Sequence, residues 1–242
     1  MDSAKHDDQE FPPTQWSMVI RAGAEDDSVR SLALEALCRA YWPAVYTFAR
    51  KLGHSPADAE DLTQGFFSMM LARGDLGKPT AEQGKFRTFI RTAFRHFALD
   101  GLREQWAQKR GGRNGVVSMD PEVMESQFRE VAGDEFSPER AFDRHFAISV
   151  LERAMDRVRE SLEKGGKGKL FEILAPFLDA GGQAPDYAEV ARQIGQSIET
   201  TRVTVSRFRQ QYRLEVRREL RETLGPHADV DEELAYLLSL FN

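Results

Sequence analysis

The sequence predicts an all-α protein made of two small helical domains. Apolar residues recur at spacings of three and four over long stretches, which is the period of an amphipathic helix. Runs of alternating apolar and polar residues, which would indicate strands, are scarce. The length of 242 residues suits one large domain or two small ones, and the hydrophobic content of 41% is sufficient for packed cores.

Composition excludes several classes of protein. The single Cys38 excludes a disulfide framework and a multi-cysteine zinc site, and the histidines are scattered without ligand spacing, so we expect no metal and no cofactor. The acidic start lacks the apolar segment of a signal peptide, and no apolar run reaches membrane-spanning length. A cytoplasmic protein without a membrane partner is expected. No nucleophile–base set or tuned carboxyl pair is visible, so we expect no enzyme.

The first predicted domain spans residues 15–106. One or two helices are expected between Ser28 and Leu52. Ser55 and Pro56 mark the start of the next helix, because Ser is a good N-cap and Pro fits the first helical position. Acidic residues lie near the positive end of its dipole, and the pattern runs to about residue 73.

The helix after Pro56 carries large apolar residues on two sides. One face is built from Ala59, Leu62, Phe66, Met69 and Met70. Nearly opposite lie Glu60, Asp61, Gln64, Phe67 and Leu71. An exposed Phe and Leu on a mixed face indicate a surface for a partner, and the alternative is a helix buried on two sides. Gly65 in the middle of the helix costs about 1 kcal/mol relative to Ala, and the local sequence offers no reason for it.

Residues 85–103 form a basic amphipathic segment. The apolar face consists of Phe86, Phe89, Ile90, Ala93, Phe94, Phe97 and Ala98. On a neighbouring face Arg87, Arg91 and Arg95 recur every fourth residue, flanked by Thr88 and Thr92. A row of cations fixed on a rigid helix is suited to hold a nucleic-acid backbone. The alternative is an amphipathic helix with a solvated basic side.

Residues 107–137 are predicted to form a flexible acidic linker, because the glycine-rich stretch 111–115 cannot hold a helix. The net charge is −6, yet Lys and Arg concentrate in residues 85–113 and 202–221. Two basic patches on an acidic chain predict two separate contacts with a polyanion.

The second predicted domain spans residues 138–224, and a C-terminal tail follows at 225–242. Its helices are expected at about 138–163, 168–179, 186–194 and 198–222. With Gly195 at the turn and Ser197 as the cap, the last two have the layout of a helix-turn-helix. The residues expected to face DNA are Thr200, Arg202, Thr204, Arg207 and Arg209. Arg binds guanine bidentately, and Thr contacts phosphate or a thymine methyl. A plain helical hairpin is the alternative.

The tail from residue 229 is acidic and amphipathic. It is interpreted either as a helix docked on the second domain or as an autoinhibitory segment that covers a basic surface.

Three motifs together resemble a bacterial RNA polymerase sigma factor of the extracytoplasmic-function class of the sigma-70 family. They read DAEDLTQGFF (58–67), FRTFIRTAFRHFALDGLR (86–103) and YAEVARQIGQSIETTRVTVSRFRQQYR (187–213). They occur in the family's order, and the resemblance covers roughly residues 15–222. The segments FPPTQWSMVI, AQKRGG and VDEELAYLLSLF are similar to a subgroup common in bacteria rich in Ser/Thr kinases.

The resemblance implies a role for each motif in a protein that does no chemistry itself. The helix after Pro56 would bind core RNA polymerase, with the β and β′ subunits as partners, through Asp58, Glu60, Asp61, Gln64, Phe67 and Leu71. The basic segment would open and read the −10 element of promoter DNA through Arg87, Thr88, Arg91, Thr92, Arg95 and His96. The helix-turn-helix would read the −35 element through Thr200, Arg202, Thr204, Arg207 and Arg209. A flexible linker would combine two weak contacts through effective concentration.

Departures from the family pattern lead to further hypotheses. Gly65 stands where the family usually has an acidic residue, and phosphorylation of the adjacent Thr63 by a Ser/Thr kinase would add roughly −1.5 to −2 charge. An anti-sigma protein is another possible partner. His96 replaces an Asn often found in the −10 helix, so promoter preference is not carried over. The alternative function is a helix-turn-helix regulator that binds DNA without polymerase.

Overall fold

The computed structural model describes residues 27–73, 85–99, 120–133, 135–178, 184–224 and 228–241, with the backbone alone for 27–37 and 71–73. This part of the chain is helical and contains no strand, which confirms the predicted all-α fold. The helices are α2 (Asp27–Lys51), α3 (Pro56–Arg73), α4 (Phe86–Leu99), α6 (Pro121–Val131), α7 (Pro138–Lys164), α8 (Gly168–Leu174), the 3-10 helix η3 (Ala175–Leu178), α9 (Tyr187–Ile194), α10 (Ile198–Thr223) and α11 (Val230–Ser239).

Local sequence signals fix most helix ends. The Ser55 hydroxyl accepts a hydrogen bond from the Asp58 amide at 3.2 Å, so Ser55 caps α3 as predicted. The Ser137 hydroxyl caps α7 in the same way through the Arg140 amide. At the end of α9 Gly195 has a φ of 67°, a left-handed conformation that favours glycine.

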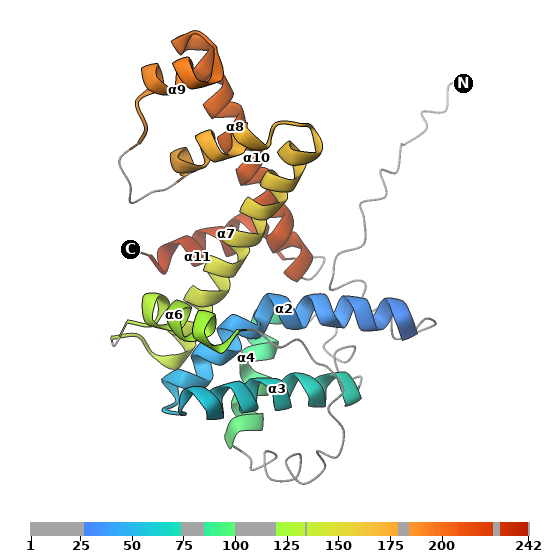
Figure 1. Ribbon diagram of the computed structural model, residues 1–242. Coiled ribbons are helices and arrows are strands. Elements are labelled where there is room, and N and C mark those ends of the chain that lie inside the picture. Colours follow the sequence, from blue (N-terminus) through green and yellow to red (C-terminus); the bar gives the residue numbers. More distant parts are fainter. Residues whose placement is uncertain are drawn as a thin grey trace, which may run out of the picture.

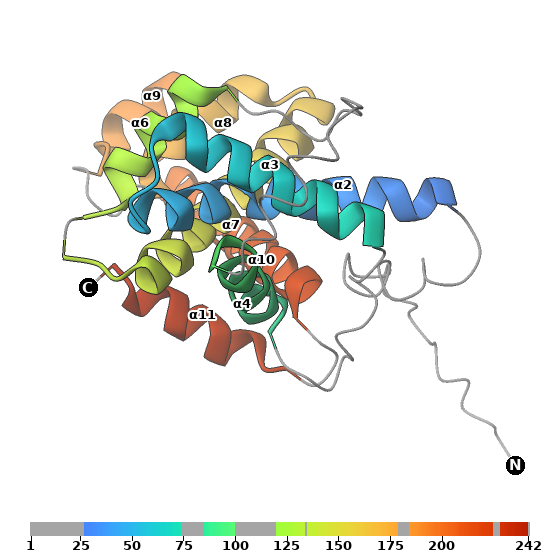
Figure 2. The same cartoon turned by 90° about the horizontal axis from the view of Figure 1, so that it is seen from below.

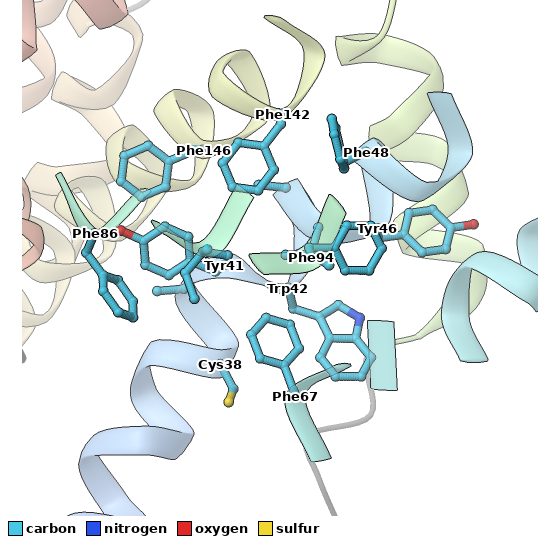
Figure 3. Packing of buried hydrophobic residues seen from close by; sticks show 14 of the residues in the cluster. Cys38, Tyr41, Trp42, Tyr46, Phe48, Phe67, Phe86, Phe94, Phe142 and Phe146 are labelled. Carbon is cyan, nitrogen blue, oxygen red and sulfur yellow. The ribbon is translucent and has the colours of Figure 1, made fainter. Parts of the chain in front are cut away.

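The larger of two hydrophobic cores joins α2, α3 and α4 with parts of α7, α10 and α11. Aromatic rings fill its centre (Figure 3). Tyr41 of α2 stacks on Phe146 of α7 with ring centroids 4.9 Å apart and meets Phe86 of α4 edge to face at 5.3 Å. Such pairs stabilise a core beyond the area that they bury. The core therefore packs α4 against both α2 and α7, which also contact each other directly.

The smaller core lies at the opposite end of the molecule, around α8 and α9 (Figure 1). It is made of Val158, Phe171, Leu174, Phe177, Val190, Val205 and Phe208. The two long helices α7 and α10 run from one core to the other, so each contributes side chains to both.

Helix α6 lies inside the segment 107–137 that was predicted to be a flexible linker; residues 107–119 are outside the described residues. Asp120 caps its first turn through the Glu122 amide, and Met124 is buried in the larger core. Glu125 accepts hydrogen bonds from Arg50 and from the Tyr46 hydroxyl, both at 2.9 Å. These contacts hold α6 against α2, although the glycine-rich stretch before it had indicated a flexible linker.

The C-terminal tail contains α11, which packs against α7 and α10. Val230, Leu237 and Leu240 are buried in the larger core. Figure 2 shows α11 passing along the side of the molecule where α4 lies. Among the described residues, no helix has both the length and the apolar character needed to cross a membrane.

Candidate nucleic-acid interfaces and partner-binding helix

The three arginines predicted to form a row on α4 differ widely in exposure. Arg87 is only 5% exposed, and its guanidinium contacts both Asp143 of α7 and Glu233 of α11. Arg91 is half-buried, with its Nη1 atom 2.7 Å from Asp143 Oδ2. Arg95 is exposed and lies 3.2 Å from Glu139. The prediction of an accessible row is therefore wrong for Arg87 in this conformation, because acidic residues distant in sequence cover it.

Burial disfavours the charge of the Arg87 guanidinium, whereas Asp143 and Glu233 favour it. The two carboxylates prevail and raise the pKa of Arg87 above its ordinary value. Arg87 therefore stays charged inside the protein, and the carboxylates of Asp143 and Glu233 balance its charge.

The exposed surface of α4 lies beside this buried contact. It consists of Thr88, Thr92, Arg95, His96 and Leu99. These residues recur at helical spacing, so they form a continuous strip with hydroxyl, cationic and apolar character. Leu99 is 65% exposed and was not among the predicted contacts. In the sequence, its position four residues after Arg95 is the signal that would have added Leu99 to the predicted contacts.

The residues of α3 predicted to bind polymerase do not all lie on the surface. Asp61 is exposed, while Asp58, Glu60 and Gln64 are half-buried. The side chain of Leu71 lies outside the described residues. Phe67 is 2% exposed and stacks on Trp42 of α2 with ring centroids 5.5 Å apart, as Figure 3 shows. The prediction that Phe67 is exposed is wrong, because α2 covers this side of α3.

Thr63 is fully buried, and its hydroxyl donates a hydrogen bond to the Ala59 carbonyl at 2.7 Å. A kinase needs an accessible hydroxyl, and a phosphoryl group needs solvent or cationic partners. The phosphosite predicted at Thr63 therefore conflicts with the position of this side chain in the core.

Gly65 lies where α3 faces α4. A Cβ atom at this position would lie 3.4 Å from Cζ of Phe97, which is the distance of an ordinary van der Waals contact. The packing of α3 on α4 therefore leaves room for alanine, and the structure gives no reason for glycine at this position.

Helices α9 and α10 form the predicted helix-turn-helix. The left-handed Gly195 makes the turn, and the Ser197 hydroxyl caps α10 by accepting from the Thr200 amide at 3.2 Å. Val190 and Val205 are buried against each other's helices in the smaller core. The first turns of α10 therefore project from the domain, which is the placement that major-groove readers use.

The predicted contact residues of α10 fall into two groups. Thr200, Arg202 and Arg207 are exposed, as required for DNA contact. Arg209 instead turns inward, and its guanidinium donates two hydrogen bonds to the Phe177 carbonyl, at 3.0 and 3.1 Å. Thr204 is half-buried, and its hydroxyl bonds Gln196 and the Thr200 carbonyl. Arg209 therefore ties α10 to η3, and its predicted DNA contact stays a prediction.

Two exposed apolar residues on α10 were missed in the sequence. Ile198 is 45% exposed and Val203 is 50% exposed, both near Arg202 on the projecting part of the helix. Apolar side chains at such positions contact thymine methyl groups.

Within the described residues, no group of three or more His, Cys, Asp or Glu could hold a metal ion.

Among comparisons with known proteins, one finds a match, and it covers residues 37–108. No curated protein and no solved structure matches the sequence. Residues 37–108 match the family model of Sigma-70 region 2. This range takes in most of α2 and all of α3 and α4, the helices that carry the predicted polymerase-binding motif and the basic motif. The match thus supports a member of the sigma-70 family, with residues 37–108 similar to region 2.

Proposed function

We propose that the protein is an RNA polymerase sigma factor of the extracytoplasmic-function class, acting in the cytoplasm to bind core polymerase and direct it to promoters. The match of residues 37–108 to Sigma-70 region 2 is the observation that carries this proposal. The helix-turn-helix of α9 and α10 supports it, because a second DNA-binding element in the same chain suits recognition of two promoter elements.

Each surface then has a proposed role. The outer side of α3, around the exposed Asp61, binds the β′ subunit of the polymerase. The exposed strip of α4, with Thr92, Arg95 and His96, contacts the −10 element as single strands form. Arg202 and Arg207 on α10 read the −35 element as duplex.

Charge reversal on α3 tests the polymerase contact. Asp61→Arg should abolish co-purification with core RNA polymerase and promoter-dependent run-off transcription. The matched control is Glu160→Arg, which makes the same charge change at an exposed site on α7, 3.6 Å from Lys164 and outside α3. The control should keep both activities. Failure of the wild-type protein to bind core polymerase would refute the proposal.

A regulator that binds duplex DNA without polymerase is the second candidate. One observation favours it: Arg202 and Arg207 are exposed while Arg87 of the other basic helix is buried. It predicts sequence-specific duplex binding by the full chain alone. Selection from a random duplex library, with and without core polymerase, separates the two functions. Sites enriched only with polymerase favour the sigma factor.

A further inference from the structure

Two buried carboxylates from distant parts of the chain contact the basic residues at the beginning of α4. Asp143 of α7 and Glu233 of α11 are each 1% exposed, and we call them the carboxylate pair. Glu233 Oε1 lies 3.0 Å from the Arg87 guanidinium, and Glu233 Oε2 lies 2.7 Å from Lys85 Nζ. Asp143 contacts Arg87 and Arg91. Three cations that the sequence places on one basic segment are thus neutralised from inside the protein.

Tyr236 of α11 completes this contact. Its hydroxyl donates a hydrogen bond to Asp143 Oδ2 at 2.7 Å, and its ring centroid lies 4.9 Å from Cζ of Arg87. Helix α11 therefore covers the first turns of α4 with an anion, a hydroxyl and an aromatic face. The other end of α4, at Arg95 and His96, stays exposed. Only part of the predicted row of cations is accessible to nucleic acid.

We propose that α11 acts as an internal substitute for nucleic-acid phosphate, and that it must leave before α4 can hold DNA along its whole length. This inference rests on the proposed function of α4 as a DNA-binding helix. It assigns to the C-terminal tail an autoinhibitory role in the free protein. Core polymerase or single-stranded DNA would displace α11 and uncover Lys85 and Arg87.

The chemistry of position 233 separates this role from simple completion of the core. Val230, Leu237 and Leu240 already contribute buried apolar side chains of the tail to the larger core. A buried ion pair is a poor source of stability, because well-packed apolar residues of similar volume do as well or better. A carboxylate at Glu233 does, however, match the charge and the acceptor atoms of the phosphate that Arg87 and Lys85 would otherwise bind.

The attachment of α11 is also suited to release. The helix has ten residues, and helices of that length are marginal in water without packing. Its ion pair with α10, between Arg217 and Asp231, is at the surface and therefore weak. Leu238 of the helix is 49% exposed, and Phe241, which follows the helix, is 38% exposed, so the tail buries only part of its apolar surface. Exchange of one anion for another at Arg87 keeps the cation paired in both states.

The first experiment compares two neighbouring glutamates in the full chain. Glu233→Gln removes the buried carboxylate, whereas Glu232→Gln makes the same charge change on a side chain that is 76% exposed and 3.9 Å from Lys85. Binding to a fluorescent single-stranded oligonucleotide is measured by anisotropy without polymerase. We expect Glu233→Gln to bind on the order of tenfold more tightly, as the binding-competent fraction rises. Glu232→Gln should stay within about twofold of the wild type, because its ion pair is exposed.

A second pair of variants keeps the charge constant and decides the matter if Glu233→Gln does not fold. Tyr236→Phe removes only the hydrogen bond to Asp143, and Tyr46→Phe removes an equivalent bond to Glu125 that is 2.9 Å long and outside the α4–α11 contact. Tyr236→Phe should strengthen oligonucleotide binding by about threefold, and Tyr46→Phe should leave it unchanged. In the wild type, hydrogen exchange of residues 228–241 should become faster when the oligonucleotide binds.

Any of four results would overturn the inference. The two glutamine variants could bind the oligonucleotide as tightly as the wild type, the two tyrosine variants could show unchanged affinity, hydrogen exchange of the tail could stay unaltered on binding, or no variant could bind the oligonucleotide. None of these measurements uses core polymerase, so these results are distinct from failure of the proposed function, which the co-purification experiment detects.

Discussion

Replacing Phe67 by Ala distinguishes a core residue from a surface contact. The side chain is 2% exposed, stacks on Trp42 at 5.5 Å and meets Phe66 edge to face at 5.2 Å. Truncation of a buried Phe costs about 3–5 kcal/mol, and two aromatic contacts favour the upper part of that range. A loss of about 4 kcal/mol is a large share of the stability of a typical domain, about 5–15 kcal/mol. The midpoint of urea unfolding should therefore fall by about 1–2 M.

Leu99→Ala is the matched control, because Leu99 is a large apolar residue that is 65% exposed on the neighbouring α4. Its free energy of unfolding should change by less than about 0.5 kcal/mol. The assay is equilibrium unfolding followed by far-ultraviolet circular dichroism. If Phe67→Ala unfolds at the same urea concentration as the wild type yet no longer binds core polymerase, the burial argument fails and the exposed contact predicted from sequence is right.

Three other predictions follow from buried or turned side chains. Thr63→Val should cost about 1 kcal/mol in unfolding free energy through one lost hydrogen bond, whereas Thr63→Glu should cost more than about 3 kcal/mol because it buries an unpaired charge; equal urea midpoints would contradict this. Burial lowers the pKa of His145 to about 4, so the unfolded chain binds a proton that the folded chain does not as pH falls from about 6.5 to about 4. Stability should then drop by about 1.4 kcal/mol per pH unit in this window, and the slope should be smaller in His145→Gln. Arg209→Ala should lower the melting temperature, because it breaks the bonds to the Phe177 carbonyl, whereas Arg207→Ala should weaken promoter binding at unchanged melting temperature; the reverse pattern would restore Arg209 as a DNA contact.

Local features of the fold could be predicted because their causes lie within a few residues. Ser55, Ser137 and Ser197 cap the helices that follow them, and Gly195 takes the left-handed turn. The helix-turn-helix and its exposed Arg202 follow from the same short-range signals. No long-range information was needed for any of these.

Features that depend on distant contacts could not be predicted. Arg87 meets Asp143 and Glu233, which lie far along the chain, so nothing near Arg87 in sequence indicates that it is buried. Phe67 lies on the mixed face of α3, and a helical wheel cannot tell whether solvent or α2 covers that face. Phe142, Phe146 and Val150 of α7 recur at helical spacing, but this spacing does not show that they belong to the same core as α4.

The sharing of α7 between both cores has a geometric consequence. Phe142 anchors one end of this helix beside α2, and Val158 anchors the other beside α8 and α9. An unbroken α-helix behaves as a stiff rod over this length. In the free protein the exposed first turns of α10 therefore stand at a set separation and rotation from α4. If the proposed promoter recognition is right, the length of DNA between the −10 and −35 elements must match this separation, or α7 must detach from one of the two cores.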